Sequence, residues 1–294
     1  MKLATFTHEG RIRIGVVDAD GIIDLESADP RLPASMVDLL TAGEPALDAV
    51  RAAAARASHR IPLGAARLEP PVPRPRKYLA IGLNYAQHIA EAGGVAPEFP
   101  RFFNKQTTCI IGTGDPIHRP RASEELDYEG ELAFVIGKRC RHVPRALAHR
   151  VIGGYLIAND VSVRDWQRKA ATVTLGKSWD THGPIGPWIV TPDEVGDPHA
   201  LGLKTWVNGE LRQDSNTKLL VHDCFEIVEI LSTVFTLEPG DIVATGTPSG
   251  VGMGFKPPKY LKAGDVVRIE IDGIGAIKNP VIDEPSDNVR IEER

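Results

Sequence analysis

An alternating stretch of acidic and apolar residues, numbered 125 to 135, constrains the fold of this chain more than any other feature. Because successive side chains of a β-strand point to opposite faces, the pattern predicts a strand with Asp127, Glu129 and Glu131 on one face. The other face is apolar and carries Leu126, Tyr128, Leu132 and Phe134. Carboxylates in a row repel one another, so the acidic face predicts a hard divalent cation, which prefers oxygen ligands. The alternative is an edge strand whose polar face contacts water.

A second polar segment follows the apolar stretch Val151–Asn159, which is itself typical of a buried strand. The segment begins at Asp160, and we expect it to turn into a helix. Asp160, Arg164 and Gln167 would then share one helical face, since they are spaced i, i+4 and i+7. Such a face can present a carboxylate, a guanidinium and an amide to one ligand. A solvated face with an ordinary Asp–Arg pair is the competing interpretation.

A candidate catalytic base lies upstream, in the predicted helix Asn84–Glu91 that follows the predicted strand Tyr78–Gly82. His88 and Glu91 are three residues apart, so their side chains can meet on one face of the helix. A histidine oriented by a carboxylate is suited to take a proton from water. The same arrangement also occurs as a simple surface hydrogen bond.

Two lysines are candidates for stabilising negative charge near such a cation. Lys105 follows a pair of phenylalanines, and Lys177 lies in a Leu-Gly-Lys-Ser segment. An ammonium group beside a bound cation would stabilise a carboxylate or enolate oxygen of a substrate. Most lysines in proteins are simply exposed to solvent and have no specific role, so both assignments depend on the neighbouring motifs.

Composition excludes several classes of protein. With 294 residues, 42% of them hydrophobic and 25% charged, the chain can bury one large core with a small appended domain. A net charge of −5 and the lack of a basic stripe with interleaved aromatic residues argue against a nucleic-acid partner. The cysteines are three scattered residues without the spacing of a zinc site or a disulfide framework. The chain also lacks the long apolar run of a membrane span or signal peptide, so we expect a cytoplasmic protein without a membrane partner.

The proline-rich segment Pro70–Pro75 predicts a stiff linker, because proline fixes φ and lacks a backbone N–H group. We place a domain boundary there, with a small N-terminal domain at residues 1–72 and a strand-rich catalytic domain at 73–294. The first domain is expected to contain short strands and one helix over residues 36–57. In the second, Asn208-Gly209 between two predicted strands, 203–207 and 210–213, predicts a type I′ hairpin, and residues 225–235 predict a helix.

Taken together, the motifs resemble those of the fumarylacetoacetate hydrolase family. The matching segments run in order from about Lys77 to Pro280. They are Gly82-Leu83-Asn84-Tyr85 with His88 and Glu91, Phe103 with Lys105, Asp127 to Leu132, Asn159 to Gln167, Lys177-Ser178, Val207 to Glu210, and Thr245 to Gly252. Each segment is weak by itself, whereas the ordered series is specific. The short N-terminal region shifts the resemblance from the animal fumarylacetoacetases toward the acylpyruvate hydrolase and oxaloacetate decarboxylase branch.

The resemblance implies a mixed α/β, strand-rich fold, in which a rolled and mostly antiparallel sheet encloses the metal. It implies Glu129, Glu131 and Asp160 as ligands of magnesium or manganese, with calcium as a further candidate. The remaining site residues carried over from the family are Arg164, Gln167 and Thr247 for substrate binding, Lys177 as the active-site lysine, and His88 with Glu91 as the catalytic pair. Lys105 is assigned to substrate binding. Relatives are usually homodimers, so we expect a homodimer.

We therefore predict a metal-dependent hydrolase that cleaves a carbon–carbon bond of a 2,4-dioxo acid through an enolate. Decarboxylation of oxaloacetate is the first alternative, because it uses the same chelate and the same enolate. Isomerase, lyase or dehydratase chemistry on a related keto-diacid or sugar acid is another. A binding protein in which the metal only stabilises the scaffold is the alternative outside enzymes.

Overall fold

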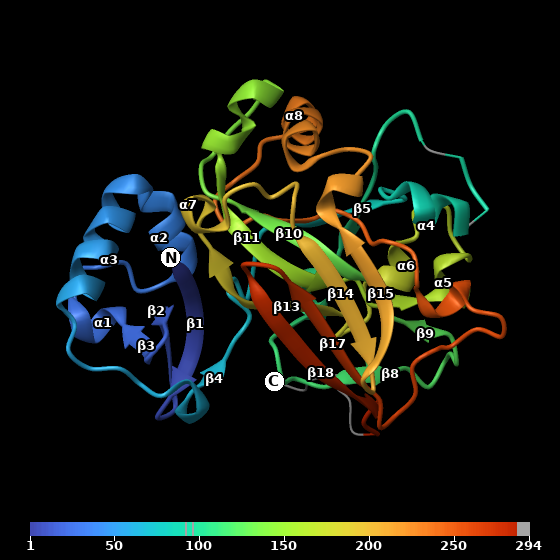
Figure 1. The fold of residues 1–294 in the computed structure, drawn as a ribbon, viewed down its shortest axis with the longest axis horizontal. Coiled ribbons are helices and arrows are strands. Elements are labelled where there is room, and N and C mark those ends of the chain that lie inside the picture. The colour runs from blue at the N-terminus through green and yellow to red at the C-terminus, as the bar shows by residue number, and fades with distance from the viewer. Residues whose placement is uncertain (92, 96, 287–294) are drawn as a thin grey trace, which may run out of the picture.

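The computed structural model describes residues 1–91, 93–95 and 97–286, and most of its strands belong to one large sheet (Figure 1). Within these residues the sheet has eleven strands, most of them paired antiparallel. Its spatial order is β3 (Gly21–Asp24), β2 (Arg11–Asp18), β1 (Lys2–His8), β13 (Gly183–Val190), β11 (Ile152–Asn159), β10 (Gly130–Ile136), β16 (Ile242–Ala244), β5 (Tyr78–Gly82) and β6 (Arg101–Lys105). The short strands β4 (Arg67–Leu68) and β7 (Ile110–Ile111) pair with β1 and β13.

A second sheet covers one face of β10, β11 and β13 (Figure 1). Its strands are β15 (Glu210–Asn216), β14 (Gly202–Val207), β17 (Val266–Ile271), β18 (Gly275–Asp283) and β8 (Ile117–Arg119). Buried aliphatic side chains from both sheets fill the space between them, among them Leu132, Ile157 and Ile269. The predicted hairpin is confirmed, because Asn208 and Gly209 join β14 to β15 with positive φ angles of 53° and 83°.

Helices lie around the sheets and are mostly short. Their bounds are α1 (Leu25–Ala28), α2 (Met36–Ala42), α3 (Glu44–Arg56), α4 (Ala86–Glu91), α5 (Arg164–Gln167), α6 (Thr174–Lys177), α7 (Pro192–Val195) and α8 (Cys224–Val234). Short 3₁₀-helices are η1 (Leu63–Ala65), η2 (Thr107–Cys109), η3 (Arg145–Arg150), η4 (Thr217–Leu219) and η5 (Gly252–Gly254). In the part of the chain that the structure describes, no helix combines the length and apolar character needed to cross a bilayer.

The N-terminal region joins the rest of the molecule through the main sheet. Strand β1 pairs with β13, with Lys2 opposite Val190 and Leu3 opposite Ile189. The helices α1 and α3 lie on the outer side of the strands β1 to β3, and α2 lies between α3 and β11 (Figure 1). The predicted single helix over residues 36–57 is wrong, because Gly43 ends α2 with a φ of 68° before α3 begins. The boundary near residue 72 stays a prediction.

Two local predictions around the acidic residues also need correction. The expected continuous strand over residues 125–135 is split into β9 (Leu126–Asp127) and β10. Asp160 is not on a helix, since Ser162 and Val163 form the short strand β12, which pairs with β9. The helix α5 begins only at Arg164. The β-branched residues Val161 and Val163 favour this extended backbone.

Candidate metal and substrate site

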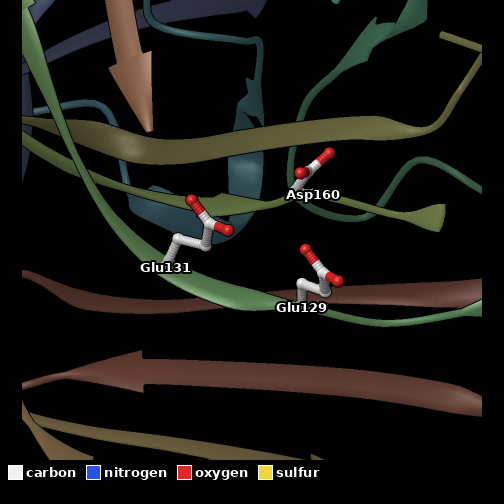
Figure 2. Close-up of side chains that lie close together, drawn as sticks. All are labelled: Glu129, Glu131 and Asp160. Atoms are coloured by element: carbon white, nitrogen blue, oxygen red, sulfur yellow. The ribbon is translucent and has the colours of Figure 1, made fainter. Parts of the chain in front are cut away.

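Three carboxylates converge where β10 begins and β11 ends (Figure 2). Glu129 precedes β10, Glu131 lies on it, and Asp160 follows β11 directly. One oxygen of each residue lies within 4.8 Å of the corresponding oxygens of the other two. All three side chains are buried, so the water-exposed edge strand is excluded as an interpretation of this acidic face. Buried carboxylates without a compensating cation are costly, and their spacing suits a divalent ion.

Backbone hydrogen bonds hold these ligand-bearing segments together. The N–H of Asp160 donates to the carbonyl oxygen of Glu129 at 2.9 Å, and the N–H of Glu129 donates to Oδ1 of Asn159 at 3.0 Å. Strand pairing places Gly130 opposite Asn159 and Glu131 opposite Ala158. The pairing of β10 with β11 therefore fixes the relative positions of all three carboxylates.

Two buried lysines neutralise part of this charge. Nζ of Lys177 lies 2.7 Å from both Oε2 of Glu129 and Oδ2 of Asp160. Nζ of Lys105 lies 2.6 Å from Oδ1 of Asp160 and also donates to the carbonyl oxygen of Lys177. Burial alone would lower the pKa of Lys177, but the charges of Asp160 and Glu129 outweigh it and raise this pKa. Lys177 is therefore an ammonium at neutral pH, suited to stabilising negative charge.

Arg164 connects the carboxylate cluster to Asp127. Its Nη1 atom lies 2.6 Å from Oε1 of Glu129, and its Nε atom donates to Oδ2 of Asp127 at 2.8 Å. Burial would raise the pKa of Glu129, yet Lys177 and Arg164 together lower it, so this side chain is ionised. The Nη2 atom of Arg164 is buried and has no hydrogen-bond partner in the described structure. An unpaired guanidinium N–H of this kind is available to an anionic ligand.

Glu131 is the carboxylate without a cationic partner. Its Oε2 atom accepts a hydrogen bond from the N–H of Gly246 at 2.8 Å, and none of the described lysines or arginines forms an ion pair with it. Burial, followed by the nearby charges of Asp160 and Glu129, raises the pKa of Glu131 well above its ordinary value. This side chain therefore gains most from a bound cation.

A charge count supports the same conclusion. With every side chain ionised, as a bound cation would favour, the cluster has four carboxylates and three basic side chains, which leaves one negative charge; the members are Asp127, Glu129, Glu131, Asp160, Lys105, Lys177 and Arg164. One divalent ion would turn the balance to one positive charge. A site with this balance fits a divalent cation and then favours an anionic substrate.

The predicted catalytic pair forms in the structure. Nδ1 of His88 lies 3.0 Å from Oε2 of Glu91, and the two residues are on α4. The other oxygen of Glu91, Oε1, accepts a hydrogen bond from the N–H of Gly250 at 2.9 Å. Since a carboxylate only accepts, Nδ1 carries the hydrogen, and the neutral ring keeps its lone pair on Nε2. This is the tautomer that a general base requires at Nε2.

The glycine-rich loop after β16 supports several of these side chains. Asp127 accepts hydrogen bonds from the N–H groups of Gly252 and Met253 at 2.7 and 3.0 Å. The Nε2 atom of Gln213 donates to Oγ1 of Thr247 at 2.8 Å, and its Oε1 accepts from the N–H of Gly130 at 3.0 Å. The roles of Asp127 and Gln213 were missed by sequence reasoning. Alternation placed Asp127 on the acidic face, but only the fold shows that it holds Arg164 and the loop.

A cavity of about 790 Å³ lies over the cluster. The predicted site residues that line it are His88, Glu129, Glu131, Arg164, Gln167, Lys177 and Thr247. Lys105, Asp160 and Glu91 support these residues from behind and are not part of its wall. The structure thus places Lys105 beside Asp160, where it holds a carboxylate in position, rather than at the cavity wall that a substrate would contact.

Comparisons with known proteins agree with this geometry. A mitochondrial oxaloacetate tautomerase of Xenopus laevis is 44% identical over 274 residues, which cover 92% of this chain and 86% of that protein. A maleylpyruvate hydrolase from Sphingobium sp. SYK-6, crystallised with manganese(II) and pyruvate, superposes with a TM-score of 0.82 at 38% identity, covering 97% of this chain and 100% of that one.

A fumarylacetoacetate hydrolase from Exiguobacterium antarcticum also has a TM-score of 0.82, at 39% identity, with 97% of this chain and 100% of that chain covered. The family model for the C-terminal region of fumarylacetoacetate hydrolases matches residues 77–282. This match includes both glutamates, the aspartate and the His88–Glu91 pair. The chain belongs to the fumarylacetoacetate hydrolase family.

Proposed function

We propose that this protein is a divalent-metal-dependent hydrolase that cleaves the bond between C3 and C4 of a 2,4-dioxo acid and releases pyruvate. One observation carries the proposal: His88, oriented by Glu91, lines the same cavity as Glu129 and Glu131. A base and a cation site in one cavity are the two components that such a hydrolysis needs.

Glu129, Glu131 and Asp160 are the residues that would hold Mg²⁺ or Mn²⁺, and their buried oxygens and surplus negative charge fit either ion. When bound, such an ion would supply Lewis-acid chemistry for a 2-oxo acid in this cavity. The maleylpyruvate hydrolase relative was crystallised with manganese(II) and pyruvate, which supports this assignment for a 2-oxo acid.

His88 then acts on water. Its Nε2 atom takes a proton from a water molecule, which adds to the carbonyl carbon C4, while Glu91 stabilises the positive charge that develops on the ring. The bond between C3 and C4 breaks, its electron pair forms the enolate of pyruvate, and C4 leaves as a carboxylic acid. Protonation of C3 completes the reaction, with one water consumed.

Cationic side chains stabilise the charge that this step creates. The ammonium of Lys177 is buried at the floor of the cavity, and Nη2 of Arg164 has a free N–H. Both groups are held in place before substrate binds, by Glu129 and by Asp127. Because such fixed charges do not reorganise during the reaction, they lower the energy of the enolate and of the transition state that leads to it.

Tautomerisation of oxaloacetate is a second candidate, favoured by the similarity to oxaloacetate tautomerases over most of the chain. In that reaction His88 would move a proton between C3 and the enol oxygen, and no water would be added. Decarboxylation of oxaloacetate shares the enolate but needs no base to activate water.

Pyruvate release from acetylpyruvate, with the keto–enol exchange and decarboxylation of oxaloacetate measured in parallel, separates these activities. We expect metal-dependent pyruvate release from acetylpyruvate, and a loss of about 100-fold or more in kcat for His88→Asn. The matched control is His59→Asn, since His59 is exposed and lies far from the site in the N-terminal region. Keto–enol exchange without acetylpyruvate cleavage would favour the tautomerase. Metal binding without any turnover would favour a scaffold role.

The homodimer remains a proposal that rests on the family resemblance. Several large apolar side chains are exposed, among them Phe99, Val234 and Phe102 of the cavity wall, as a surface covered by a second copy would require. Light scattering coupled to size exclusion should give twice the mass of one chain, and a monomer would contradict the proposal.

A further inference from the structure

Strand β6 connects the carboxylate cluster with the outer part of the cavity. Alternation along the strand places Arg101, Phe103 and Lys105 on one face. Lys105 is buried against Asp160, Phe103 is half-buried and lines the cavity, and Arg101 is exposed and also lines it. At about 3.3 Å per residue, the backbone of Arg101 lies about 13 Å from that of Lys105.

The two outer arginines of this cavity differ in their pairing. Nη2 of Arg168 lies 2.7 Å from Oε2 of Glu125, so its charge is already compensated. For Arg101, none of the described carboxylates forms an ion pair with the guanidinium. Between Arg101 and the cluster, β6 contributes Phe103 to the cavity wall, and the paired strand β5 contributes Ile81, so this part of the wall is apolar. A free guanidinium beyond an apolar wall fits the anionic end of an extended ligand.

We propose that Arg101 binds a second carboxylate at the distal end of the substrate, so that the preferred substrate is a 2,4-dioxo acid with an acyl group that ends in a carboxylate. This inference rests on the proposed function. The dioxo head lies at the carboxylate cluster, the hydrocarbon part contacts Phe103, and the distal carboxylate meets Arg101. Hydrolysis between C3 and C4 consumes one water and gives pyruvate and a dicarboxylic acid.

A matched pair of substrates tests the assignment. Fumarylpyruvate carries the distal carboxylate, and crotonylpyruvate has a methyl group in its place. We expect the wild type to prefer fumarylpyruvate. Arg101→Gln should lower kcat/KM for fumarylpyruvate about tenfold, mainly through KM, because a charge-assisted hydrogen bond at an exposed position is lost. For crotonylpyruvate the same variant should change kcat/KM less than about twofold.

Two further variants sharpen the experiment. Arg101→Lys keeps the charge and should recover part of the preference. Arg168→Gln is the control, since this arginine lines the same cavity but is already paired with Glu125. Equal losses for both substrates in Arg101→Gln, or no loss for either, would overturn the inference.

Failure of the proposed function gives a different result. If the wild type cleaves neither compound, the hydrolase assignment is wrong, and calorimetric binding of the same two compounds in the presence of Mg²⁺ then decides on Arg101. Tighter binding of fumarylpyruvate that Arg101→Gln abolishes supports the distal carboxylate site. Equal affinities in the wild type contradict it.

Discussion

Nδ1 of His88 lies 3.0 Å from Oε2 of Glu91, which is itself tied to the glycine-rich loop through the N–H of Gly250. The base is therefore oriented by a carboxylate that the loop holds in place. Helix α4 contributes both residues, so the contact between His88 and Glu91 needs no distant part of the fold. The position of this pair relative to the cation site, in contrast, depends on how α4 packs against the rest of the fold.

Glu91→Gln should separate orientation of the base from metal binding. The amide keeps the size of the side chain but removes the charge that stabilises protonated His88. We expect kcat to fall about 100-fold, and the affinity for Mn²⁺ to stay within about threefold of the wild type. Steady-state pyruvate release and calorimetric titration with Mn²⁺ check the two statements. An unchanged kcat would show that Glu91 does not orient a base.

Gly254→Ala should disturb the same carboxylate from the other side. A Cβ atom at position 254 would lie 2.2 Å from Oε1 of Glu91, so the glutamate or the loop must move. We expect a loss of about tenfold or more in kcat with metal binding retained. Gly64→Ala is the matched control, because its added Cβ would meet no atom within 4 Å. Equal kinetics in the two variants would contradict the role of the Glu91–loop contact.

Glu131→Gln should remove most of the stabilisation that bound Mn²⁺ gives to the folded protein. Glu131 has no basic partner, and its neutralisation relieves the repulsion that raises its pKa. The metal-free variant should therefore melt no lower than the metal-free wild type. At Mn²⁺ concentrations about 100 times the Kd, the wild type should gain about 2.7 kcal/mol in stability, and the variant much less. Glu9→Gln, at an exposed position, should behave as the wild type does. A normal Mn²⁺ response in Glu131→Gln would exclude this residue as a ligand.

A buried histidine outside the cation site gives a pH prediction. Burial lowers the pKa of His182 to about 3, and its Nε2 atom donates to the carbonyl oxygen of His118 at 2.8 Å. Between pH 6.5 and 3 the unfolded chain binds a proton that the folded chain does not, so stability falls as pH decreases through this window. At pH 5 the loss is about 2 kcal/mol relative to pH 7.5.

Urea unfolding at pH 7.5 and pH 5 measures this contribution. The variant His182→Gln should lose less stability than the wild type over this interval, since it has no ring to protonate, although it is less stable at both values. His59→Asn is the control, because His59 is exposed and should leave the pH dependence unchanged. If the free energy of unfolding of His182→Gln falls with pH as steeply as that of the wild type, another group is responsible for the pH dependence.

Several elements and contacts could be predicted from local sequence patterns, whereas the fold and the full set of candidate site residues came from the family resemblance. Alternation identified the acidic face around Glu129 and Glu131, and the spacing of His88 and Glu91 predicted their contact, because both depend only on the geometry of one element. The helix error at Gly43 has a local cause as well: the glycine adopts a positive φ that ends α2. A glycine inside a periodic pattern signals this only weakly.

The remaining features depend on contacts between distant residues. Substrate binding by Lys105 stays a prediction, and no local pattern indicated that the fold brings Lys105 to Asp160, which is 55 residues away in sequence. Asp127 is also a carboxylate and was predicted on the same strand face as Glu129 and Glu131. Its oxygens, however, accept hydrogen bonds from Arg164 and from backbone N–H groups of the loop. No local pattern distinguishes these roles, because each depends on segments that are distant in sequence: β6 and the end of β11 for Lys105, and β9, α5 and the glycine-rich loop for Asp127.

The most direct test of the account is a titration of chelator-treated enzyme with Mn²⁺, following pyruvate release from acetylpyruvate and heat of binding in the same samples. The account predicts one Mn²⁺ per chain, and activity that rises with the same midpoint as binding. Pyruvate release that persists without metal, or a fully loaded enzyme that releases none, would contradict the claim that this site performs metal-dependent hydrolysis.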